Sequence, residues 1–194
     1  LHKMSIFLAA LKLSADTIVV QSSADTNSSG TLRYAMLHAN PGDTITFDPS
    51  VTSISLANSL PAVTQSSLTI TAPAQVTIDG GSLYGVFSVA AGTLTLENVY
   101  VRNGRSLGGA GGDGNPSGGG GGGGAGGGGG LYVHTGSSVI LNGVGFDTCQ
   151  AVGGNGGNVQ NGTGVAVNSG GGGGGFNGGN GGKGTSSSTG GGGG

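Results

Sequence analysis

Residues 68–78 contain two short alternating stretches, Leu68-Thr69-Ile70-Thr71 and Val76-Thr77-Ile78, with Pro73 between them. Alternation of apolar and polar residues is typical of half-buried β-strands, because successive side chains point to opposite faces of a sheet. The same pattern recurs in Thr44-Ile45-Thr46-Phe47, Ser53-Ile54-Ser55-Leu56, Leu94-Thr95-Leu96, Val99-Tyr100-Val101 and Val139-Ile140-Leu141. The sequence therefore predicts a chain built mainly of short strands.

The strands recur at a nearly constant interval. Thr-Ile-Thr begins at Thr44 and again at Thr69, and the related Thr-Leu-Thr begins at Thr93. Units this short cannot bury an apolar face alone, so they must stack on one another. The pattern predicts an all-β fold, a right-handed parallel β-helix. The alternative is an antiparallel sandwich, in which Asp79-Gly80 and Asn103-Gly104 would form hairpin turns.

Side-chain directions follow from the alternation. We expect Ile45, Ile70 and Leu94 to point into the core of the stack while the flanking threonines face outward. The related segment that begins at Val139 lies beyond Thr93 by more than one such interval. This longer distance fits one further coil of the stack together with an insert.

Residues 31–39 break the β pattern. Leu32, Ala35, Met36 and Ala39 follow helical spacing, and Asn40-Pro41 ends the run. Ser29 or Thr31 can cap the start of this helix. A short helix placed here would cover the open end of the stack, where the apolar core and unpaired strand edges are otherwise exposed.

Composition excludes several classes of protein. The chain has 194 residues, of which 49 are Gly and 7% are charged, with a formal net charge of −2. A nucleic-acid-binding protein needs an excess of Lys and Arg, which is absent here. The glycine runs lack the Lys-Ser/Thr of a phosphate-binding loop, and the three His residues are isolated, so we expect no nucleotide, cofactor or metal ligand.

The N-terminal residues 1–15 resemble a secretory signal. His2 and Lys3 precede a short apolar run, and the small residues Ser14 and Ala15 follow it. The run is too short and too interrupted for a membrane-spanning helix, so we expect no membrane-spanning segment. Cys149 is the only cysteine, which excludes a disulfide framework.

Glycine content changes sharply near residue 104 and suggests a division of the chain. The predicted parts are a signal-peptide remnant (1–15), an N-terminal cap with the first coils (16–103), a Gly-rich insert (104–130), one further coil (131–152) and Gly-rich inserts with a short strand at 165–167 (153–194). The chain starts without Met and stops inside a glycine run, so we expect it to be the N-terminal fragment of a longer protein.

Two interpretations of the glycine tracts stay open. The simpler one is a flexible linker, because ordering Gly costs more backbone entropy than ordering any other residue. However, Gly-Gly-X triplets recur at 108–116, 153–158 and 178–183. A helix with three residues per turn would place every third side chain on one edge. The tracts would then pack as a lateral polyglycine II layer, open to self-association with other copies.

Two stretches, one near the start of the chain and one after most of the first glycine insert, resemble a known family. Gly30-Thr31-Leu32-Arg33 leading to Asp43-Thr44-Ile45-Thr46-Phe47 is similar to the cap and first coil of bacterial secreted β-helix passengers. Residues 128–133, followed by Phe146-Asp147-Thr148-Cys149, resemble the paired repeat of polymorphic outer-membrane-protein and autotransporter-type adhesins, with Cys149 where Asn is usual. This resemblance implies a secreted or cell-surface location and a host, matrix or glycan surface as partner.

We therefore expect an exported structural or adhesive passenger without catalysis of its own. A β-helix can also be a polysaccharide lyase or hydrolase, and this alternative would place the catalytic coils outside the sequence. Glycoside hydrolysis needs two facing carboxyl groups. Six of the eight carboxylates here, Asp43, Asp48, Asp79, Glu97, Asp113 and Asp147, are scattered singly. A lyase would need an Arg base, for which Arg102 and Arg105 are the candidates.

A second alternative rests on the outward threonines. Stacked strands lie about 4.8 Å apart, so Thr44, Thr46, Thr69, Thr71, Thr93 and Thr95 would form a flat grid of hydroxyl groups. Such a grid is typical of ice-binding solenoids. Threonine is also a favoured residue on exposed strands, so the grid has a purely structural interpretation as well.

Overall fold

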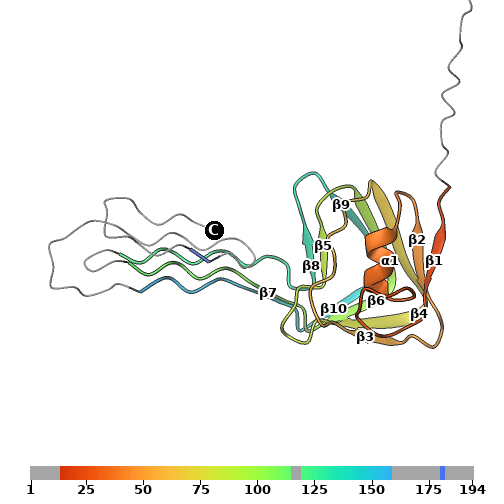
Figure 1. Cartoon of the computed structure of the whole chain (residues 1–194), viewed down its shortest axis with the longest axis horizontal. Coiled ribbons are helices and arrows are strands. Elements are labelled where there is room, and N and C mark those ends of the chain that lie inside the picture. The colour runs from red at the N-terminus through yellow and green to blue at the C-terminus, as the bar shows by residue number, and fades with distance from the viewer. Residues whose placement is uncertain (1–13, 115–118, 159–179, 182–194) are drawn as a thin grey trace, which may run out of the picture.

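The computed structural model describes residues 14–114, 119–158 and 180–181 (Figure 1). The predicted signal segment, apart from residues 14 and 15, and the predicted strand at 165–167 lie outside the described residues. Among the described residues, strands predominate and one helix occurs. The elements are β1 (Thr17–Val20), α1 (Leu32–His38), β2 (Thr44–Phe47), β3 (Ser53–Ser55), β4 (Ser67–Asp79), β5 (Phe87–Val89), β6 (Thr93–Arg102), β7 (Arg105–Leu107), β8 (Leu131–Val133), β9 (Ser138–Asn142), β10 (Gly145–Asp147) and β11 (Gln150–Val152).

All the strand pairs in the described residues are parallel. The largest sheet has the order β1-β2-β4-β6-β10, with β3 added to β4 and β9 added to β6; β5 pairs with β8 and β7 with β11. On the face formed by β1, β2 and the first halves of β4 and β6, which we call the first face, Thr17 pairs with Thr44, and Thr44 pairs in turn with Thr69. The prediction of a β-rich chain with parallel sheets is confirmed, and the antiparallel alternative is wrong for these strands.

The register differs from the predicted one at the third repeat. Thr95, not Thr93, pairs with Thr69, and Thr93 pairs with Ser67. Thr93 and Thr95 point to the same face of the strand, so the alternating pattern cannot distinguish the two registers. The third repeat is therefore slightly longer than the recurrence of Thr-Leu-Thr suggests.

The core lies on the inward face of these strands. Ile45, Ile70 and Leu94 are fully buried, as predicted from the alternation. Because of the register, Leu96 is the neighbour of Ile70, and Leu94 is the neighbour of Leu68. Each side chain buried in this way stabilises the fold by about 1.5–3 kcal/mol.

Long strands bend so that one segment of chain can belong to two faces. In β4 the pairing with β6 shifts between Thr71 and Val76. In β6 the bend falls at Asn98, which has φ 55° and donates from its side-chain amide to the carbonyl oxygen of Ala72 at 3.0 Å. Between β9 and β10 the bend falls at Gly143, with φ 61°. Bends in successive layers therefore coincide.

Helix α1 occupies the predicted position. Its apolar residues Leu32, Ala35 and Met36 are buried in the common core, and the helix packs against β1 and β2. The cap is Thr31, whose hydroxyl accepts a hydrogen bond from the N–H of Tyr34. Strand β1, which precedes the helix, could not be predicted because Thr17–Val20 lacks an alternating pattern.

The glycine-rich segments leave the strands at one side. Figure 1 shows the chain continuing from β7 as extended segments that project from the strand-rich body and are not labelled as strands. Strand β7 lies within the range predicted as the first glycine insert, 104–130, so the ladder of strands continues to Leu107.

Candidate functional site

The predicted hydroxyl face is present but is arranged in different columns. Thr17, Thr44, Thr69 and Thr95 are in register across four strands. Each of the last three is half-buried, because its neighbours in the column pack against it. The structure therefore brings together a continuous column of four threonines, one of which, Thr17, the sequence analysis did not include.

The second and third columns are mixed. Thr46 and Thr71 are in register, but the column continues with Glu97, which accepts a hydrogen bond from the side-chain amide of Asn142 at 3.2 Å. Thr93 belongs to a column with Ser67 and Ser138. The threonine column ends at Ile140, which pairs with Thr95, and Val19 pairs with Thr46; both apolar side chains are exposed. The face is therefore mixed, with one threonine column rather than a grid of six equivalent threonines.

Three of the singly scattered carboxylates, Asp43, Asp48 and Asp113, hold the backbone in place. Asp43 is buried and accepts hydrogen bonds from the N–H groups of Asp16 and Asn40, both at 2.8 Å. Asp48 accepts from the N–H and the hydroxyl of Ser50, and these hydrogen bonds hold its pKa below the usual value. Asp113 accepts from the N–H of Asn158 at 2.8 Å.

Asp79, at the end of β4, and Arg102, at the end of β6, form an ion pair. Burial acts to raise the pKa of Asp79, but hydrogen bonds from Gly81, Asn103 and Arg102 and the Arg102 charge outweigh it, so the pKa lies below its usual value. The Nε of Arg102 lies 2.8 Å from the carboxylate. Arg102, one of the two arginines named as candidate lyase bases, is thus held in an ion pair.

The glycine segments form an ordered hydrogen-bonded array. Gly108 and Gly111, which follow β7, donate to the carbonyl oxygens of Val152 and Asn155, at 2.8 and 2.7 Å. Gly114 continues the series by donating to Asn158 at 3.0 Å. The parallel pairing of β7 with β11 therefore extends into the glycine segments, with a donor at every third position.

A third glycine segment, residues 119–126, runs back alongside both of the others. Gly121 and Gly124 donate to Gly112 and Gly109, while Gly157 and Gly154 donate to Gly121 and Gly124. Residues 119–126 are therefore antiparallel to each of the other two segments. In these described residues each segment is bonded to both of the others, which favours the layer interpretation over the flexible linker.

Close approach explains the glycines at every third position. A Cβ atom at Gly108 or Gly111 would overlap the carbonyl oxygen of Gly124 or Gly121. The same holds at Gly120, Gly123, Gly154 and Gly157. At Gly122, by contrast, a Cβ atom would meet nothing within 4 Å. We call the segments 108–114, 119–126 and 152–158 the glycine array.

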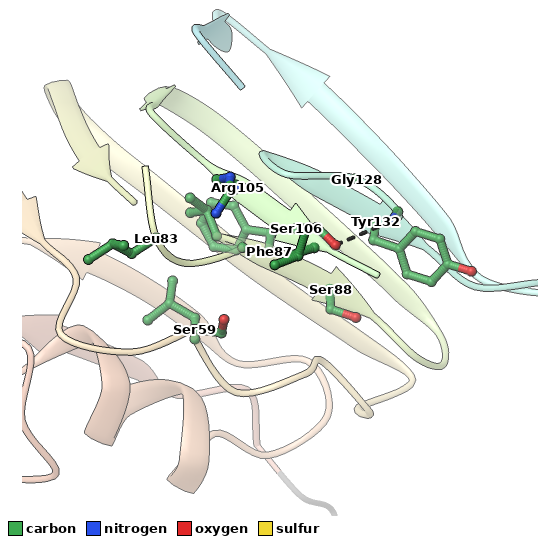
Figure 2. A pocket seen from close by; sticks show the side chains of 13 residues that line it. Ser59, Leu83, Phe87, Ser88, Arg105, Ser106, Gly128 and Tyr132 are labelled. Carbon is green, nitrogen blue, oxygen red and sulfur yellow. Dashed lines mark hydrogen bonds between the residues drawn. The ribbon is translucent and has the colours of Figure 1, made fainter. Parts of the chain in front are cut away.

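A hollow of about 360 Å³ lies where β7 leaves the body (Figure 2). Its walls come from four stretches of chain, residues 59–60, 83–88, 105–107 and 127–132. Figure 2 shows Leu83 and Ser59 at one end, Tyr132 at the other and Arg105 between them. Arg105 is a candidate from the sequence alone. The hollow could not be predicted, because no sequence pattern indicates that these four distant stretches are in contact.

Metal clusters and membrane-spanning helices are not found within the described residues. There, His, Cys, Asp and Glu side chains form no group of three or more that could hold a metal ion. In the same part of the chain, no helix has the length and apolar character needed to cross a membrane. Comparison with protein-family models, curated proteins and solved structures found no match.

Proposed function

We propose that this chain is an exported structural or adhesive protein of the cell surface, folded as a right-handed parallel β-helix. Support for the β-helix comes from the parallel pairs along the first face, in which Thr17, Thr44, Thr69 and Thr95 follow one another at a nearly constant interval. The coinciding bends in β4, in β6 and between β9 and β10 add a second strand direction to each layer, as a coil requires.

The glycine array is proposed to be a polyglycine II layer. In that conformation the chain has three residues per turn, which accounts for hydrogen bonds from Gly108, Gly111 and Gly114. Ordering so many glycines costs about 1–2 kcal/mol per residue in backbone entropy. Folding therefore loses much backbone entropy in ordering segments that consist mostly of glycine.

This observation carries the functional proposal. Asp113 is the one ionisable side chain of the array, and it accepts a hydrogen bond from the N–H of Asn158. The array therefore offers shape and contact rather than acid–base or nucleophilic chemistry. The projecting array and the hydroxyl face fit a protein that spaces or attaches surfaces. The resemblance to secreted adhesin passengers supports the same role, with a host, matrix or glycan surface as the partner.

An adhesion assay tests the proposal. Beads coated with the whole chain are applied to immobilised matrix proteins and polysaccharides, and retention under flow is measured. The double variant Thr69→Lys/Thr95→Lys changes the hydroxyl face, and Thr52→Lys/Thr64→Lys changes exposed threonines elsewhere. We expect a several-fold loss of retention only with the first variant. Absent retention of the unaltered chain, or equal loss with both variants, contradicts an adhesive role for this face.

Ice binding is a second candidate function, favoured by the column of Thr17, Thr44, Thr69 and Thr95. Neighbouring strands lie about 4.8 Å apart, so the hydroxyls form a regular row. Glu97, in register with Thr71, interrupts the adjacent column. Thermal hysteresis that disappears with Thr69→Lys would replace the adhesive proposal by this one, and no hysteresis at millimolar concentration would remove it.

Lateral self-association is proposed for the exposed side of the glycine array. Gly122 has open space where its side chain would be, so a neighbouring copy could approach its backbone closely. We expect concentration-dependent dimers in analytical ultracentrifugation and their loss with Gly122→Val. A chain that is monomeric at all concentrations would contradict this proposal while leaving the adhesion assay unaffected.

A further inference from the structure

The hollow in Figure 2 carries a positive charge that no described carboxylate neutralises. In the described part of the chain, the other two arginines are paired, Arg33 with Asp25 at 2.7 Å and Arg102 with Asp79 at 2.8 Å. Arg105 forms no such pair with the described carboxylates. A guanidinium group presents a planar fork of donors that matches a carboxylate, so Arg105 favours an acidic ligand.

An aromatic side chain stands at the far end of the same hollow. The ring of Tyr132 meets that of His134 edge-on, with centroids 4.6 Å apart. In turn, Nε2 of His134 lies 3.3 Å from the hydroxyl oxygen of Ser88. This chain of contacts fixes the tyrosine ring beside the hollow, where Figure 2 shows it. A fixed ring offers a flat apolar surface with a polar tip.

The remaining walls mix apolar and hydroxyl groups. Leu83, which is 68% exposed, supplies apolar surface, while Ser59 and Ser88 supply hydroxyls. The volume of about 360 Å³ lies at the lower end of the range of small-ligand sites. The lining therefore suits a compact ligand that is rich in hydroxyls and carries an apolar face.

An extended peptide does not suit this hollow. Peptides commonly bind by adding a strand to a free sheet edge. At the hollow, β5 is bonded to Val63 on one side and to β8 on the other. Likewise, β7 is bonded to Tyr84 and to β11, so neither strand offers a free edge there. A sugar ring, by contrast, needs only an apolar surface and dispersed hydrogen-bonding groups.

A second hollow of about 380 Å³ lies on the side of the glycine array. It shares Arg105 and Leu107 with the first, and Asn155 and Asn180 contribute amide groups to it. Because Arg105 lies on both hollows, it occupies the middle of a surface longer than one monosaccharide. A short oligomer could place one acidic unit at Arg105 and a neighbouring unit in each hollow.

We propose that these two hollows form a binding site for an acidic oligosaccharide. The carboxylate of one sugar unit binds the guanidinium of Arg105, and the adjoining ring lies against Tyr132. This site adds a small-ligand function to the proposed structural role and lies apart from the hydroxyl face, so the two can be tested separately.

Calorimetric titration of the whole chain tests the site. The probes are trimers of galacturonic acid and of glucuronic acid, with galactotriose as the neutral control and an acidic tripeptide as the competing class. Arg105→Gln and Tyr132→Leu alter the site, and Arg102→Gln removes an arginine outside it. Amide spectra of each variant establish that it is folded.

We expect saturable binding of at least one acidic trimer and at least tenfold weaker binding of galactotriose. Arg105→Gln should weaken the acidic trimer at least tenfold, Tyr132→Leu several-fold and Arg102→Gln less than twofold. The proposal is overturned if neither acidic trimer binds, if galactotriose binds equally well, if Arg105→Gln has no effect or if the tripeptide binds as tightly.

Discussion

Two adjacent glycines show that the array tolerates a Cβ atom at one position and not at the next. At Gly123 a Cβ atom would overlap the carbonyl oxygen of Gly154, whereas at Gly122 it would meet nothing. Neither glycine has a positive φ, so backbone conformation does not distinguish them. The difference between the two positions is one of contact alone, which makes them a matched pair for mutation.

Gly123→Ala should therefore disrupt the array and Gly122→Ala should not. Overpacking of this kind costs about 1–3 kcal/mol, so amide exchange at Gly154 should accelerate at least tenfold in Gly123→Ala. Gly122→Ala should leave exchange unchanged or slow it slightly, because Ala restricts the unfolded chain. Equal exchange rates in the two variants would show that the segments are not packed as described.

At the scale of elements, the cap of α1 illustrates how local chemistry sets a boundary. Thr31 is buried and its hydroxyl lies 2.6 Å from the carbonyl oxygen of Thr26 as well as 3.3 Å from the N–H of Tyr34. Ser29, the other cap expected from the sequence, is exposed. The buried hydroxyl joins the preceding loop to the first turn of the helix.

Thr31→Ala should lower the free energy of unfolding by about 1–2 kcal/mol, the usual effect of losing an N-cap. Ser29→Ala should change it by less than about 0.5 kcal/mol, as for most exposed positions. Chemical denaturation of both variants measures the difference. Comparable losses in the two would mean that the cap is shared or misplaced.

Strands β2, β3, β4, β6 and β9 and the helix could be predicted because alternation and helical spacing are local properties of sequence. The short strands β1, β5, β7 and β11 were not predicted. The register of the third repeat could not, because both Thr93 and Thr95 are outward-facing and flank buried leucines. Only the lengths of the turns and the bulge between Thr71 and Val76 decide between the two pairings. Arg105 could be singled out, but its place in a hollow depends on contacts between distant stretches.

At the scale of the whole molecule, buried carboxylates join separate parts of the chain. Asp25 accepts hydrogen bonds from Arg33 in α1 and from the N–H groups of Ala57 and Asn58. Burial acts to raise the pKa of Asp25, but these hydrogen bonds and the Arg33 charge outweigh it, so the pKa lies below its ordinary value of 3.8. Asp48 and Asp79 also have lowered pKa values.

These groups make the protein sensitive to acid. Because their pKa values are lower in the folded state than in the unfolded state, their stabilisation is complete above the ordinary Asp value of 3.8 and is lost as the pH falls below it. The midpoint temperature of thermal unfolding should therefore decrease as the pH is lowered below about 4. Asp25→Asn should lower the midpoint at neutral pH and reduce its pH dependence. A midpoint that stays constant or rises on acidification would contradict this assignment.

The central claim is that a ladder of parallel strands continues outward as an ordered array of glycine segments. The most direct test is residue-resolved amide hydrogen exchange of the whole chain by NMR. We predict slow exchange at the bonded glycines, Gly108, Gly111, Gly121, Gly124, Gly154 and Gly157, together with slow exchange in β2, β4 and β6. Exchange of these glycine amides at the rates of an unstructured peptide would contradict the account.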